Sequence, residues 1–149
     1  MNTSPRACLF RLGTQLFALP GEYTRQVHTV TNLRPVPKAP ELLRGLFPVR
    51  SGVLPLVTLE PLLDLEVTEH VMAVQMEFEG NELAFGVSEM IGFNPLDRST
   101  LKPVPLEAGR VRDLTMGVFL FGDQPVLVLD ASKLMAALSH AFGAIRVAA

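Results

Sequence analysis

The residue types that most often carry chemistry are few and scattered in this chain. The histidines His28, His70 and His140 lie far apart, and no two of them have the i, i+4 spacing that places two ligands on one helix face. A protein metal site needs several converging ligands, and no cluster of ligand residues is visible. We therefore expect no metal and no cofactor, and we interpret the three histidines as surface or structural residues.

No nucleophile stands in a catalytic motif. Ser51 follows Arg50 in an expected turn, but its neighbours do not form the G-x-S-x-G pattern that exposes a serine nucleophile. Cys8 is the only cysteine, which excludes an intramolecular disulfide, and its apolar surroundings indicate a packed side chain. No G-x-x-x-x-G-K-[ST] phosphate loop occurs. We therefore expect that the protein is not an enzyme.

The charge balance argues against nucleic acid as a partner. Thirteen Lys+Arg against fifteen Asp+Glu give a formal net charge of −2, and one tyrosine with no tryptophan offers little surface for base stacking. A small β-barrel nucleic-acid-binding module is nevertheless the alternative function that we carry forward.

The longest uncharged stretch near the C-terminus, residues 134–145, is too short to cross a bilayer, and the N-terminus has no apolar signal segment. We expect a cytoplasmic protein without direct membrane insertion.

The elements that must position any site are short. Twelve prolines and eleven glycines interrupt the 149 residues at close intervals, which favours many short strands over long helices. Alternating apolar residues around turn signals predict hairpins over residues 7–19, 46–57, 72–87 and 115–129, with a further strand at 27–30. Pro55 predicts an edge strand or a bulge. Thr58 is predicted to cap a short helix, and Asp130 a longer one over residues 131–142.

The two halves of the chain, approximately residues 7–66 and 71–142, repeat one pattern. The turn residues Gly13-Thr14 correspond to Gly80-Asn81, 67 residues later, and Gly45-Leu46-Phe47 corresponds to Gly117-Val118-Phe119, 72 residues later. Each half reads as hairpin, short helix, loop, hairpin and helix. About five short strands in each half indicate two small barrels, because barrel closure removes exposed strand edges. We expect the C-terminal helix to pack across the seam between them.

Four blocks carry a resemblance to a known family: CLFRLGTQLFALP, PVPKAPELLRGLFPVRSGVLPLVTLEPLL, VMAVQMEFEGNELAFGVSEMIGF and GVFLFGDQPVLVLDASKLM. In order and spacing they resemble the CheW-type chemotaxis coupling proteins from residue 7 to about residue 140, most specifically over residues 37–63. The resemblance implies a single CheW-like domain over residues 1–149. It implies a mainly β fold of two intertwined five-stranded SH3-like barrels, with short helices and a C-terminal helix.

The resemblance also implies a function and a set of contact residues. Family members are non-enzymatic adapters that couple the cytoplasmic tip of a methyl-accepting chemoreceptor to the regulatory domain of a CheA-type histidine kinase, in membrane-associated receptor arrays. By position, the residues implied to contact the kinase are Gln26, Arg50, Lys102 and Leu106. Those implied to line a receptor groove at the seam are Val27, Val87 and Ile91. We expect all three groove residues to be at least partly exposed.

Departures and alternatives accompany these assignments. The family commonly has Asn-Leu-Arg-Gly where this chain has Pro48-Val49-Arg50-Ser51, and an enteric-type member has a glutamate where this chain has Gln26. A planar guanidinium at an exposed turn can bind a partner carboxylate through two hydrogen bonds, but a charged turn residue is also often simply solvated. The groove residues could equally be core residues, and the loop that carries Lys102 could be a connector.

Overall fold

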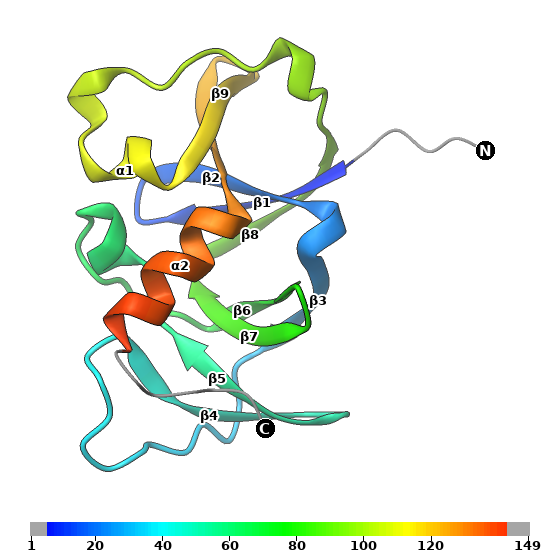
Figure 1. Ribbon diagram of the computed structural model, residues 1–149. Coiled ribbons are helices and arrows are strands. Elements are labelled where there is room, and N and C mark those ends of the chain that lie inside the picture. The colour runs from blue at the N-terminus through cyan, green and yellow to red at the C-terminus, as the bar shows by residue number, and fades with distance from the viewer. Residues whose placement is uncertain (1–5, 143–149) are drawn as a thin grey trace.

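The computed structural model describes residues 6–142, and ten strands in this range form two five-stranded sheets (Figure 1). Sheet A has the order β8-β1-β2-β10-β9, with β1 at Arg6–Leu12, β2 at Gln15–Pro20, β8 at Glu89–Pro95, β9 at Thr115–Phe121 and β10 at Gln124–Leu129. Sheet B has the order β3-β6-β7-β5-β4, with β3 at Thr24–Thr29, β4 at Leu43–Val49, β5 at Gly52–Val57, β6 at Met72–Phe78 and β7 at Asn81–Val87. The predicted mainly β fold with two five-stranded units is confirmed.

Helices are short, as the frequent prolines and glycines predict. The 3-10 helices are η1 (Gly21–Tyr23), η2 (Glu60–Leu63), η3 (Arg98–Thr100) and η4 (Leu106–Ala108), and the α-helices are α1 (Arg110–Asp113) and α2 (Ala131–Ala141). Asp130 caps α2 as predicted, because its Oδ1 accepts a hydrogen bond from the Lys133 backbone N–H at 3.1 Å. The predicted cap at Thr58 is wrong. Helix η2 begins later, after Leu59, and the Thr58 Oγ1 is buried without a hydrogen-bond partner among the described residues.

The two halves of the chain exchange their first hairpins. Sheet A combines β1 and β2 of the first half with β8, β9 and β10 of the second, and sheet B combines β6 and β7 of the second half with β3, β4 and β5 of the first. The two strand orders coincide when five is added to each first-half number and subtracted from each second-half number, so β8 joins β1 as β3 joins β6. This exchange confirms the internal repeat and its intertwining. The predicted offset of 67 for the first hairpin is wrong by one residue, since β1 and β6 begin at Arg6 and Met72. Gly80 occupies the second position of its turn, whereas Gly13 occupies the first.

Neither sheet closes into a barrel through a continuous ladder, but one isolated bridge joins the ends of each. In sheet B, Arg34 exchanges two backbone hydrogen bonds with Leu46 of β4, with N···O distances of 2.9 and 2.7 Å. In sheet A, Lys102 exchanges two with Val118 of β9, both 2.9 Å long. The SH3-like units are therefore open barrels, each closed at a single point.

Glycine at corresponding positions permits both bridges. Gly45 and Gly117 have φ values of +155° and +157°, a region that disfavours other residues. A Cβ at Gly45 would lie 2.5 Å from the Arg34 carbonyl oxygen, and one at Gly117 would lie 2.8 Å from the Leu101 Cβ. The repeated Gly-aliphatic-Phe sequence thus reflects a close crossing of two chain segments.

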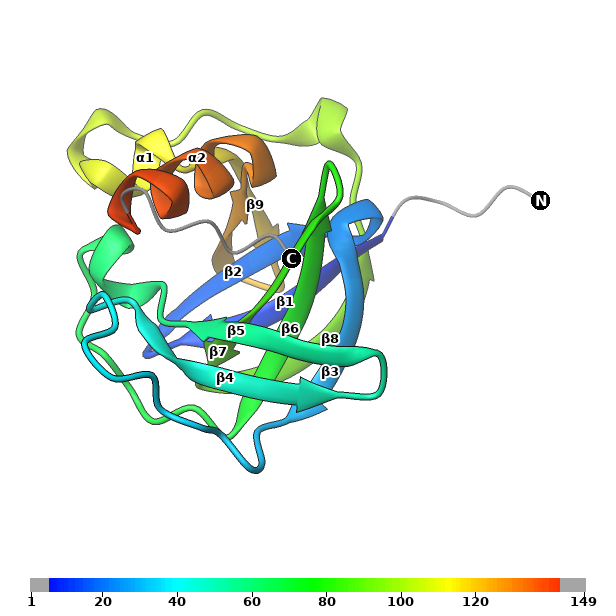
Figure 2. The same ribbon diagram turned by 60° about the horizontal axis from the view of Figure 1, so that its bottom comes forward.

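One large core cluster joins both sheets. It contains Phe10 of β1, Phe17 of β2 and Phe85 of β7, with the ring centroids of Phe10 and Phe85 5.2 Å apart. Helix α2 contributes Leu134 and Leu138 to the same cluster, and Figures 1 and 2 show this helix lying over the space between the sheets. The predicted packing of the C-terminal helix across the seam is confirmed.

Two local predictions differ from the structure. The strand β8 was not expected, because Gly92 and Pro95 interrupt its apolar pattern. Pro55 marks neither an edge nor a bulge, since β5 lies between β4 and β7 and the register shift occurs near Leu43. Pro55 is tolerated because it lies opposite Leu46, whose own backbone groups bond Arg34 on the other side, so no ladder bond to β4 needs the missing N–H.

Candidate functional site

The residues assigned to kinase contact lie on the surface in two separate places. Gln26 on β3 and Arg50 in the two-residue turn between β4 and β5 are exposed, and both belong to sheet B. Lys102 at the closing bridge of sheet A is exposed, and Leu106 in η4 has 74% of its surface accessible. The structure thus places two of these residues on each unit. Their roles in binding remain predictions.

Arg50 is available to a partner by its position. It follows Val49, whose register partner is Gly52, so Arg50 and Ser51 form the tip of the hairpin. The guanidinium forms no ion pair within residues 6–142, and the β4–β5 hairpin extends from the body of the molecule (Figure 2). An Arg at this position contributes little to the core and can bind a carboxylate of another protein.

The three residues assigned to a receptor groove do not lie together on the surface. The expectation that Val87 is exposed is wrong, because it is fully buried at the end of β7, within the large core cluster. Val27 on β3 is half-buried against that cluster, and Ile91 on β8 is half-buried against a second cluster under sheet A. Only Val27 and Ile91 can therefore contribute to a surface groove.

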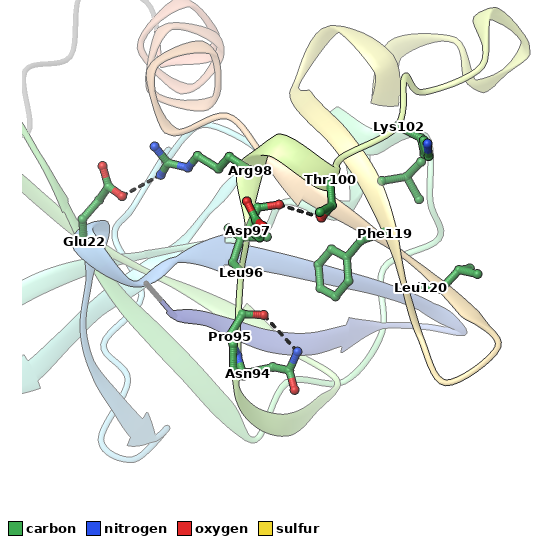
Figure 3. Close-up of a pocket in the computed structure, with 11 residues that line it drawn as sticks. Glu22, Asn94, Pro95, Leu96, Asp97, Arg98, Thr100, Lys102, Phe119 and Leu120 are labelled. Carbon is green, nitrogen blue, oxygen red and sulfur yellow. Dashed lines mark hydrogen bonds and ion pairs between the residues drawn. The ribbon is translucent and has the colours of Figure 1, made fainter. Parts of the chain in front are cut away.

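A pocket that the sequence did not indicate opens on sheet A (Figure 3). It has a volume of about 930 Å³ and lies between the segment that follows β8 and the strand β9. Leu96 and Phe119 form part of its apolar wall, and Figure 3 shows the Phe119 ring between β9 and the turn that carries Asp97 and Thr100. Lys102 lies at one side of it.

Most charged groups around this pocket already have partners. The Arg98 Nη2 lies 2.6 Å from the Glu22 Oε1, and the Asp97 Oδ1 accepts hydrogen bonds from the Ser99 backbone N–H at 3.0 Å and the Ser99 hydroxyl at 2.6 Å. These bonds from Ser99 lower the pKa of Asp97. Lys102 forms no ion pair in the described part of the chain, so it is the positive charge of the pocket lining that has no acidic partner there.

The repeat shows which side chain occupies the equivalent place in the other unit. In sheet B the corresponding place is filled by the His28 ring, which contacts Phe47 with centroids 5.4 Å apart and hydrogen-bonds Gln75 at 2.7 Å. By strand register, Asn94 of β8 corresponds to His28, since they pair with Ala7 and Ala73 of equivalent strands. The smaller Asn94 bonds the carbonyl of its own neighbour, Pro95, and leaves the space unfilled.

A buried polar network also escaped the sequence analysis. Glu60 and His70 have side chains 0% and 1% exposed, and the His70 Nε2 lies 2.7 Å from the Glu60 Oε2. The same oxygen accepts hydrogen bonds from the Thr68 backbone N–H and hydroxyl at 3.1 and 2.8 Å. The Thr68 hydroxyl in turn bonds Ser88, whose Oγ accepts a bond from the Gly13 N–H at 2.9 Å. The network therefore ties the linker between the halves to both sheets.

The protonation of this network follows from its geometry. Burial opposes ionisation of Glu60, but the hydrogen bonds from His70 and Thr68 outweigh it and hold the pKa of Glu60 below its usual range. The His70 ring lies directly over β7, where a Cβ at Gly86 would approach the His70 Nδ1 to 2.3 Å. His70 is thus a structural residue, which is one of the two roles, surface or structural, that we expected for the histidines.

The remaining reactive group is inert. Cys8 is fully buried in β1, and burial raises the pKa of its thiol to about 12.

Within residues 6–142, no three His, Cys, Asp or Glu side chains lie close enough to share a metal ion. None of the helices in the same range is both long and apolar enough to cross a membrane.

Comparison with known proteins identifies the family. The sequence matches the model of the CheW-like domain over residues 6–139, so the chain belongs to the CheW-like domain family. The crystal structure of the scaffolding protein TtCheW from Thermoanaerobacter tengcongensis is similar with a TM-score of 0.75 and 16% sequence identity, covering 86% of this chain and 90% of that chain. At that identity the likeness shows the shared fold. A search of curated proteins gave no match. Family membership supports a general role as an adapter in chemotaxis signal transduction.

Proposed function

We propose that the protein couples the cytoplasmic tip of a methyl-accepting chemoreceptor to the regulatory domain of a CheA-type histidine kinase. The observation that carries the proposal is the placement of exposed contact candidates on both units, with Gln26 and Arg50 on sheet B and Lys102 and Leu106 on sheet A. Kinase-contact candidates on both units would let the adapter meet two kinase regulatory domains, and the half-buried Val27 and Ile91 are the candidates for the receptor contact. We place it in the cytoplasm, recruited to receptor arrays at the membrane.

The kinase contact is tested at Arg50. We expect Arg50→Glu to weaken binding of the kinase regulatory domain by about 2–5 kcal/mol, since it replaces one member of a charged pair with a like charge. The unfolding temperature should stay unchanged, because Arg50 is an exposed turn residue. Arg44→Glu is the matched control, as Arg44 is also exposed, lies on β4 and forms no ion pair in the described residues. Equal affinities of the two variants would contradict an Arg50 contact.

The receptor contact is tested at the half-buried strand residues. Val27→Ser and Ile91→Ser should lower the affinity for a receptor-tip fragment while the affinity for the kinase domain stays the same. Val87→Ala is the informative comparison, because a fully buried residue affects stability and not a surface contact. If Val27→Ser and Ile91→Ser leave the receptor affinity unchanged, or lower it no more than Val87→Ala does, the groove lies elsewhere.

A further inference from the structure

The outer edge of β9 presents unpaired backbone groups beside the pocket of sheet A. Val118 directs both its N–H and its C=O to Lys102, so it lies in a non-hydrogen-bonded pair with Leu127 of β10. Such pairs alternate along an antiparallel ladder, and the next one joins Leu120 to Pro125. The N–H and C=O of Leu120 therefore point away from β10, to the same side as those of Val118. Pro125, which has no N–H, is consistent with this register.

The chain leaves the place opposite Leu120 open. Continuing the antiparallel register from Lys102 and Val118 would place Thr100 beside Leu120, but residues 98–100 turn away into η3. The cavity of about 930 Å³ lies between these two segments and is lined by Thr100, Phe119 and Leu120. One further strand thus has both space and hydrogen-bonding groups at this edge.

The other unit lacks this opportunity. The residue of β4 that corresponds to Leu120 is Pro48, which likewise lies in a non-hydrogen-bonded pair, with Val53 of β5. Proline has no N–H to donate, and prolines are a common means of protecting an edge strand from pairing with another chain. The edge is therefore blocked at Pro48 and open at Leu120.

The surroundings of the open edge indicate what chemistry fits it. Leu96 and Phe119 offer an apolar wall to a side chain from an added strand, and Leu120 itself is 68% exposed. Lys102 lies in the path that an added strand would continue, and it is the positive charge of the pocket lining that forms no ion pair among the described residues. An aliphatic residue beside an acidic residue complements both features.

We propose that sheet A binds an extended peptide segment of a partner protein as an additional strand, paired with β9 at Leu120. An aliphatic side chain of the segment occupies the pocket, and an acidic side chain at its end meets Lys102. The strand addition shares Lys102 with the candidates for kinase contact, but it requires neither kinase nor receptor and is tested with a peptide alone.

The test uses the whole chain and the acetylated, amidated heptapeptide EVTVTVE, which can present an acidic end to Lys102 in either direction. Amide hydrogen exchange of Leu120 should be fast in the free protein, while that of Phe119, which bonds β10, is slow. The peptide should slow exchange at Leu120. The same peptide with its central backbone nitrogen methylated should bind about tenfold more weakly, because it cannot donate to the edge.

Three variants complete the test. Leu120→Pro should weaken peptide binding about tenfold and keep the unfolding temperature, as proline is tolerated at the corresponding Pro48. Leu120→Thr keeps the backbone donor and should retain binding. Lys102→Glu should weaken it by about fivefold.

The proposal is overturned if the Leu120 amide is already protected in the free protein, or if the peptide does not bind at millimolar concentration. Equal binding of the methylated peptide, which would indicate a helix or a side-chain contact, overturns it too. Dimerisation of the protein through β9, detected by sedimentation, would also overturn the proposal. The methylated peptide decides the question even if Leu120→Pro unfolds.

Discussion

Replacing the buried Glu60 with glutamine is expected to destabilise the fold strongly at neutral pH and much less in acid. The substitution conserves shape but removes the charge of a side chain that is 0% exposed. Its Oε2 accepts three hydrogen bonds, from the Thr68 N–H, the Thr68 hydroxyl and the His70 Nε2. These bonds hold the linker between the two halves, so weakening them affects the whole molecule.

The magnitude follows from these three bonds. A hydrogen bond to a charged group contributes about 1.5–3 kcal/mol and one between neutral groups about 0.5–1.5 kcal/mol, so each bond loses about 1 kcal/mol. The sum is about 3 kcal/mol. Glu89→Gln is the control, since Glu89 is 60% exposed in its pair with Arg11 and should lose about 1 kcal/mol or less.

The direction of the Glu60 pKa shift determines at which pH the Glu60→Gln substitution costs more stability. The pKa of Glu60 in the folded protein lies below its ordinary value of 4.5, so the folded state favours the carboxylate. The stabilisation is fully present above pH 4.5 and is lost as the pH falls through the lowered pKa. Glutamine does not titrate, so the difference in unfolding free energy between wild type and Glu60→Gln should shrink in acid.

Urea unfolding followed by far-UV circular dichroism, at neutral pH and below pH 4.5, measures this difference. The reasoning is refuted if Glu60→Gln loses no more stability than Glu89→Gln at neutral pH. It is also refuted if the loss is the same at both pH values, because the destabilisation would then come from packing and not from charge.

Two further predictions concern backbone crossing and thiol chemistry. Gly117→Ala should destabilise the fold by about 1–3 kcal/mol more than Gly92→Ala in urea unfolding, since Gly92 has a φ of +143° with open space around it while a Cβ at Gly117 meets Leu101 at 2.8 Å; equal losses would show that only backbone strain matters. The Cys8 thiol, with a pKa of about 12, should react with Ellman's reagent only as fast as the protein unfolds, and rapid labelling in native buffer would contradict its burial.

Hairpins were predictable from the sequence because their information is local. Alternating apolar residues and a turn glycine specify β1 and β2 without reference to the rest of the chain. Strand β8 was missed because Gly92 breaks the alternation, and what stabilises β8 is its pairing with β1, far away in sequence. Local patterns predict strands, but they do not specify which strands pair.

The residues of the candidate site also separate into those that the local sequence predicts and those that it does not. The exposure of Arg50 and Leu106 follows from turn and loop residues, which lie at the surface. Val87 was assigned wrongly to the surface because an apolar strand residue looks the same whether it faces a groove or the core. The Glu60–His70 pair could not be predicted, since no motif distinguishes a buried carboxylate from a solvated one. The pocket lies beside Asn94, where the other unit has the larger His28, a difference visible only by comparing the two units.

The strand exchange imposes an order on folding during synthesis. All five strands of sheet B have been made once Val87 has been added, whereas sheet A lacks β8, β9 and β10 at that point. The hairpin of β1 and β2, although translated first, must therefore wait for strands translated last, and β10 is complete only at Leu129. Such distant pairing slows folding and leaves an apolar hairpin with unpaired edges on the nascent chain. A ribosome stalled before Leu129 would carry a finished sheet B and an unfinished sheet A, so the earliest segment of this protein is among the last to become native.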